Sequence, residues 1–133
     1  MKSNLDSIFK SNTSLEQKGI WLEINESTAF LVKRYGGSNS HEISKKLAEL
    51  SKPYVVLIDK NMLPPEKDKE IVVRSFVETS ILDWRGIDID KEKDVKFTHE
   101  AATQLLISLP DLHETLVRYA SDAQNYLADM GNS

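Results

Sequence analysis

Two short apolar runs near the start of the chain flank a polar turn, which is the pattern of a β-hairpin. The first run covers residues 19–24 (GIWLEI) and the second covers residues 29–35 (AFLVKRY), with NEST between them. β-Branched and aromatic residues dominate both runs, as is usual in strands. Because an isolated hairpin is only marginally stable in water, we expect it to pack against helices or against another subunit.

Helical spacing of apolar residues begins after a glycine-rich break at residues 36–38. Asn39 and Glu42 have the spacing of an N-terminal capping box, so a helix is predicted from there to Leu50. The following segment, residues 53–58 (PYVVLI), is compatible with a strand or with a helix. Its β-branched residues favour a strand, whereas proline is common in the first turn of a helix.

A long helix is predicted from Pro65 to Arg85, because apolar residues recur there at intervals of three and four. Gly86 is a natural end for this helix. The next ten residues, 87–96 (IDIDKEKDVK), are predicted to be an exposed link. The apolar stripe of the long helix consists of Val72, Val73, Phe76, Val77, Ser80, Ile81 and Trp84.

Two further helices are predicted in the last third of the chain. Thr98 is a suitable N-cap for the first, and Pro110 closes it. Asp111 with Glu114 has capping-box spacing for the second. The predicted inner faces are Ala101, Ala102, Leu105, Leu106 and Leu109 in the first helix, and Leu112, Leu116, Tyr119, Ala120, Ala123, Leu127 and Met130 in the second.

These elements predict an α+β fold that is mainly α, with an N-terminal β-hairpin followed by four to five helices. A chain of 133 residues is expected to form one domain. We expect residues 1–18 to be a flexible arm, residues 19–130 to form the domain, and residues 131–133 to be a disordered tail.

The composition is that of a soluble globular protein, with 40% hydrophobic and 29% charged residues. The net charge of −4 argues against a nucleic-acid partner, because binding of nucleic acid depends on neutralising phosphates. The absence of cysteine excludes disulfides and thiol nucleophiles. No apolar run is long enough to span a bilayer, so we expect a cytoplasmic protein without a membrane partner.

Two patterns that resemble metal sites are incomplete. The acidic run Asp88, Asp90, Glu92 and Asp94 resembles the start of a calcium loop, but Lys93 stands where the turn glycine is required. The dipeptide His-Glu occurs at His41, His99 and His113, yet none has a second histidine four residues later. We therefore predict no catalytic, cofactor or metal site. A small hydrolase that uses the three histidines is the competing enzymatic hypothesis.

Three aromatic residues are the candidates for partner binding. Trp84 continues the stripe of the long helix, which favours a core position, but tryptophan is also enriched at binding hot spots. Tyr119 and Tyr126 are two helical turns apart on the predicted last helix. They suit either the edge of the core or one side of a partner-binding face.

The order of the elements is informative beyond each motif alone. A helix ending in ILDWRG (residues 81–86) is followed by a charged spacer, by FTHE (residues 97–100) at a helix start, and by LPDL (residues 109–112). Over residues 19–127 this order resembles the tail assembly chaperones of long-tailed bacteriophages and prophages.

The resemblance implies a non-enzymatic protein without a cofactor. Such chaperones bind the tape measure protein in the cytoplasm of the host bacterium and keep it soluble until tail tube subunits assemble around it. They are absent from the mature virion. The tail tube protein is a second expected partner, and edge-to-edge pairing of hairpins would give a homo-oligomer. The alternative is a structural virion component, such as a tail completion or head–tail joining protein.

Overall fold

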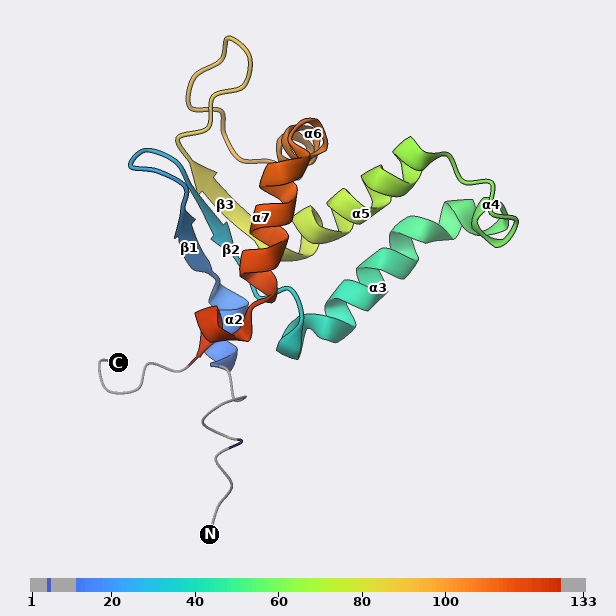
Figure 1. Ribbon diagram of the computed structural model, residues 1–133, viewed down its shortest axis with the longest axis horizontal. Helices are drawn as coiled ribbons and strands as arrows, with labels where there is room; N and C mark the ends of the chain where they lie inside the picture. The colour runs from blue at the N-terminus through green and yellow to red at the C-terminus, as the bar shows by residue number, and fades with distance from the viewer. Residues whose placement is uncertain (1–4, 6–11, 128–133) are drawn as a thin grey trace.

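A computed structural model describes Leu5 and residues 12–127 of the chain (Figure 1). The strands and α-helices, in chain order, are α2 (Thr13–Lys18), β1 (Ile20–Glu23), β2 (Ala29–Val32), α3 (Ser40–Ser51), α4 (Val55–Asp59), α5 (Pro65–Ser80), β3 (Ile81–Arg85), α6 (His99–Ser108) and α7 (Pro110–Ser121). Short 3-10 helices are η1 (Gly37–Asn39), η2 (Lys52–Tyr54) and η3 (Ala123–Tyr126).

The predicted α+β, mainly α class is confirmed, and the hairpin is followed by α3 to α7. β1, β2 and β3 form an antiparallel sheet in that order. The main core lies between this sheet and helices α5, α6 and α7. Its buried apolar residues are Phe30, Val32, Val73, Phe76, Val77, Ile81, Trp84, Ile87, Ala102, Leu106, Leu116 and Ala120.

The long helix predicted to Arg85 is wrong at its C-terminal end, because α5 stops at Ser80 and the chain continues directly as β3. The pairing of β3 with β2 shifts register between Leu31 and Val32. This irregularity places both Ile81 and Trp84 in the core, although residues three apart in a regular strand face opposite sides. The interval of three residues between Ile81 and Trp84 therefore matched the spacing expected of a helix, although the segment is a strand.

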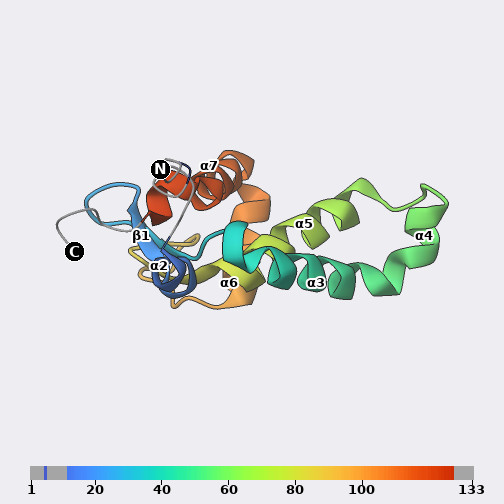
Figure 2. The same cartoon turned by 90° about the horizontal axis from the view of Figure 1, so that it is seen from below.

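Helices α3 and α4 and the first turns of α5 form an arm that projects from the rest of the molecule (Figures 1 and 2). Helix α3 packs against α5, yet no residue of α3 or α4 is buried. The ambiguous segment 53–58 is helical and lies at the tip of the arm, where η2 leads into α4.

The N-terminal arm predicted for residues 1–18 is wrong for its last part, because residues 13–18 form α2. Glu16 of α2 is 1% exposed, and its carboxylate lies 2.8 Å from Nη1 of Arg34 and accepts a hydrogen bond from Ser38 Oγ at 2.7 Å. This buried ion pair attaches α2 to the loop before α3. Residues 1–4 and 6–11 of the predicted N-terminal arm lie outside the described residues.

One of the predicted helix caps is confirmed and two are wrong. The Thr98 hydroxyl accepts a hydrogen bond from the Ala101 amide at 3.0 Å, as predicted for an N-cap. Asn39 does not cap α3 through its side chain, because its amide donates to the backbone carbonyls of Glu16 and Arg34 instead. The second capping box is also absent, since α7 begins at Pro110 without a side-chain cap.

The end of the chain is less helical than predicted. α7 ends at Ser121, and Asp122 then caps the short helix η3. Met130 and the predicted disordered tail at residues 131–133 lie outside the described residues. η3 places Tyr126 in the core, where its hydroxyl donates to the Val32 carbonyl at 3.0 Å.

The segment after β3 is anchored rather than fully exposed. Gly86 has a φ of +69°, and a Cβ atom added there would lie 1.9 Å from the carbonyl oxygen of Ser27 in the hairpin turn. A glycine is thus required by the close approach of two backbones as well as by its conformation. Ile87 is buried next to it, whereas the acidic residues of this segment are exposed, as predicted.

Candidate protein-binding surfaces

Trp84 is a core residue, which agrees with one of the two roles that its sequence pattern allowed. It is 5% exposed, and its indole packs edge-to-face against Phe30 and Phe97. The indole Nε1–H donates to the Val95 carbonyl at 2.7 Å. The side chain thus holds the 87–97 loop against β3, and in this conformation it has almost no surface to offer a partner.

Tyr126 and Tyr119 do not form the shared face that helical spacing predicted. Tyr126 is fully buried, and burial raises the pKa of its phenol well above the usual range. Tyr119 on α7 is half-buried, and burial raises its pKa as well. Of the three candidate partner-binding residues, only Tyr119 has an appreciable accessible surface.

The three histidines lie on three different helices. His41 is exposed on α3, and His99 at the start of α6 packs against Phe97. His113 on α7 packs against Phe76, and burial, with a smaller contribution from Lys69, lowers its pKa. The part of the chain that the structure describes contains no group of three or more histidine, aspartate and glutamate side chains placed to hold a metal ion.

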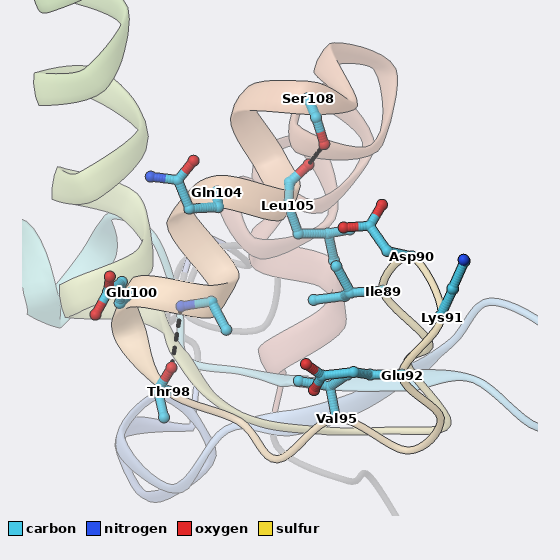
Figure 3. Close-up of a pocket in the computed structure, with 11 residues that line it drawn as sticks. Ile89, Asp90, Lys91, Glu92, Val95, Thr98, Glu100, Gln104, Leu105 and Ser108 are labelled. Atoms are coloured by element: carbon cyan, nitrogen blue, oxygen red, sulfur yellow. Dashed lines mark hydrogen bonds between the residues drawn. The ribbon is translucent and has the colours of Figure 1, made fainter.

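An open hollow of about 940 Å³ lies between the 87–97 loop and helix α6 (Figure 3). The side chains of Ile89 and Leu105 point into it, and that of Lys91 points away. Its lining also includes the acidic residues Asp90, Glu92 and Glu100. Because Trp84 fixes Val95 in the wall of the hollow, the tryptophan contributes to this surface by positioning the loop.

The most apolar exposed surface of the described residues lies on the arm. Seven of the twelve exposed large hydrophobic side chains are there, and Val56 and Met62 are 61% and 65% exposed. Single exposed apolar residues are normal on proteins, whereas several on one projection make a candidate interaction site. We call this group the arm patch; it consists of Leu47, Val55, Val56, Leu57, Ile58, Met62 and Val72.

Two hollows flank α4 within the arm. One, of about 700 Å³, lies between α3 and α4, and the other, of about 560 Å³, lies between α3, α4 and α5. Ile58 lines both hollows. The arm therefore has an indented helical surface, which is the shape that accepts another helix.

One feature of the sequence points to the arm patch, although it is not a chemical motif. Residues 55–58 are four consecutive apolar residues. In a strand buried on both faces such a run is ordinary. In a helix of five residues at the tip of an arm, it must leave apolar side chains exposed, because successive residues point in different directions around the axis.

Fold and surfaces together define a small α+β protein with an apolar helical arm, and similarity to known families identifies it further. The chain belongs to the YdaY prophage protein family, whose model matches residues 38–130. The match begins just before α3 and includes the whole arm, β3, α6 and α7. The protein is thus a prophage protein.

No curated protein and no solved structure matches the chain. Within the residues that the structure covers, no helix combines the length and the apolar character needed to cross a membrane.

Proposed function

We propose that this prophage protein is a non-enzymatic tail assembly chaperone that binds the tape measure protein in the cytoplasm of the host bacterium. The single observation that carries the proposal is the arm patch. The folded domain keeps seven large apolar side chains exposed on one projection. Membership of a prophage family and the resemblance of the element order to tail assembly chaperones support the same function.

The physical task of such a chaperone matches this surface. A long helical client with exposed apolar stripes aggregates unless these stripes are covered. An indented helical arm covers a stripe by helix-in-groove packing. The net charge of −4 keeps the resulting complex soluble. The chaperone would be displaced when tail tube subunits assemble around the client, so it would be absent from the virion.

Co-expression with the tape measure protein of the same prophage tests the proposal. We expect the two proteins to co-purify and the client to remain soluble only when the chaperone is present. Two serine substitutions in the arm patch, Val55→Ser and Ile58→Ser, should abolish co-purification, because these side chains line the hollows that would receive the client. Their melting temperatures should stay close to that of the wild type, because both side chains are already exposed.

A matched control uses apolar residues that are exposed elsewhere. Leu82 and Leu109 are 40% and 47% exposed and lie outside the arm. The double variant Leu82→Ser, Leu109→Ser should retain the client. Loss of the client in this control but not in the arm variant, or failure of the folded wild-type pair to associate, would refute the proposal.

A structural virion component, such as a tail completion or head–tail joining protein, is the second candidate. The observation in its favour is that β1 (Ile20–Glu23) pairs with β2 alone among the described strands, so its outer edge is open to a strand of another copy. Mass spectrometry of purified virions separates the candidates, because a joining protein should be present in stoichiometric amounts and a chaperone should be missing.

A further inference from the structure

The hollow between α3 and α4 combines an apolar lining with two lysine side chains. Its apolar lining comes from Ala48 on α3 and from Val55 and Ile58 on α4. Two lysines, Lys45 and Lys52, stand beside this lining. A helix that enters the hollow would thus meet apolar side chains along its centre and ammonium groups at its margin.

Both of these lysines lack a partner within the described part of the chain. No ion pair or side-chain hydrogen bond there involves Lys45 or Lys52. The one acidic residue of the lining, Glu49, is already paired, because its carboxylate lies 3.2 Å from Nζ of Lys46. The margin of the hollow is therefore positively charged, although the protein as a whole carries a charge of −4.

The spacing of the two lysines adds geometry to this charge. They are seven residues apart, which is two helical turns or about 10.5 Å along a helix axis. Ala48 and Glu49 lie between them on the same side, and the small side chain of Ala48 lets another helix approach closely. Two carboxylates two turns apart on an opposing helix would match this spacing.

We propose that the α3–α4 hollow binds an amphipathic helical segment of the client whose apolar stripe is flanked by two acidic residues about seven positions apart. The proposal rests on the proposed function, in which the occupant is a segment of the tape measure protein. Apolar contacts with Val55 and Ile58 provide most of the affinity. The ion pairs with Lys45 and Lys52 fix the register and exclude helices that carry lysine or arginine at these positions.

The test uses the full chain and two synthetic helical peptides of about 18 residues, a length at which helices become stable. Both peptides carry the same leucine and alanine stripe. One has glutamate at the two flanking positions, and the other has lysine there. Fluorescence anisotropy at low and high salt gives the dissociation constants.

We expect the acidic peptide to bind about tenfold more tightly at low salt, because two rim attractions replace two repulsions of similar size. The difference should shrink at high salt, where exposed charges are screened. The charge reversal Lys45→Glu, Lys52→Glu should invert the preference. The control Lys18→Glu, Lys96→Glu makes the same change in net charge on exposed lysines outside the arm, and it should keep the preference for the acidic peptide.

Equal affinity for the two peptides, no binding of either, or inversion by the control variant would overturn the proposal. A chain that dimerises through the hollow, detected as a monomer–dimer equilibrium that Lys45→Glu, Lys52→Glu abolishes, would also overturn it.

The same variants separate this inference from the proposed function. If the tape measure protein co-purifies equally well with wild type and with Lys45→Glu, Lys52→Glu, the chaperone function stands and the hollow is not the client site. If the acidic peptide is preferred but the tape measure protein never associates, the hollow has the inferred specificity and the chaperone function fails.

Discussion

Replacing Trp84 by phenylalanine tests the assignment of this residue to the core. The substitution keeps an aromatic ring between Phe30 and Phe97 but removes the Nε1–H that donates to the Val95 carbonyl at 2.7 Å. It also leaves space where the second ring of the indole lay. A core residue should respond with a loss of stability, whereas a client contact should respond with a loss of binding.

The expected loss is about 2–3 kcal/mol in the free energy of unfolding. An acceptor left without its donor costs about 1–2 kcal/mol of this. The smaller ring contributes roughly 1 kcal/mol through lost burial, on the scale of about 0.8 kcal/mol for each buried methylene group. Replacement by alanine would cost about 3–5 kcal/mol, which approaches the whole stability of a domain of this size, so phenylalanine is the better probe.

Urea denaturation followed by circular dichroism measures this difference. Trp21 is 41% exposed, so Trp21→Phe is the matched control and should change the free energy of unfolding by less than about 0.5 kcal/mol. In the Trp21→Phe background, Trp84 is the sole tryptophan, and its fluorescence should resist acrylamide quenching. Ready quenching of this fluorescence, or equal stability of Trp84→Phe and wild type, would refute the core assignment.

Three further predictions concern stability. Glu16→Gln should destabilise the domain by about 3 kcal/mol in urea denaturation, because it leaves the partly buried Arg34 cation uncompensated; an unchanged midpoint would mean that α2 is not held by this ion pair. Gly86→Ala should cost more than about 2 kcal/mol, since a positive φ disfavours alanine and the added Cβ would collide with the Ser27 carbonyl; normal stability would contradict the close approach of the two backbones. Burial lowers the pKa of His113, so the folded state binds a proton more weakly than the unfolded state, and the free energy of unfolding should fall as the pH drops below about 6.5. His113→Leu should reduce this slope between pH 7 and the folded-state pKa, and identical slopes in the two proteins would show that another group is responsible.

The hairpin and most helices could be predicted from the sequence because their apolar periods agree with their final environment. The exception is the C-terminal end of the predicted long helix. The stripe of α5 continues in register through Ile81 to Trp84, and the irregular pairing of β3 buries both of these residues three positions apart. Only the pairing with β2, a contact between segments about fifty residues apart in the chain, distinguishes this strand from another helical turn.

The binding surface was harder to predict than the fold. Aromatic residues were the predicted contacts with a partner. A large aromatic side chain is equally suited to filling a core, however, and Trp84 and Tyr126 do so. The arm patch consists instead of aliphatic residues such as Val56. A periodicity argument assigns aliphatic residues to the core. Their exposure follows from the absence, among the described residues, of a further layer over α3 and α4. That absence is a property of the tertiary arrangement.

The hydrogen bond from the Tyr126 hydroxyl to the Val32 carbonyl joins residues 94 positions apart, and the Asn12 amide donates to the Tyr126 carbonyl at 2.6 Å. Both bonds close loops that span most of the chain, and such closures are entropically costly and slow. During synthesis, the hairpin and the arm can form while the position of Tyr126 is still empty. The last step of folding must therefore wait until Tyr126 has left the ribosome, and a chain that stops before Tyr126 would leave the Val32 end of the sheet open.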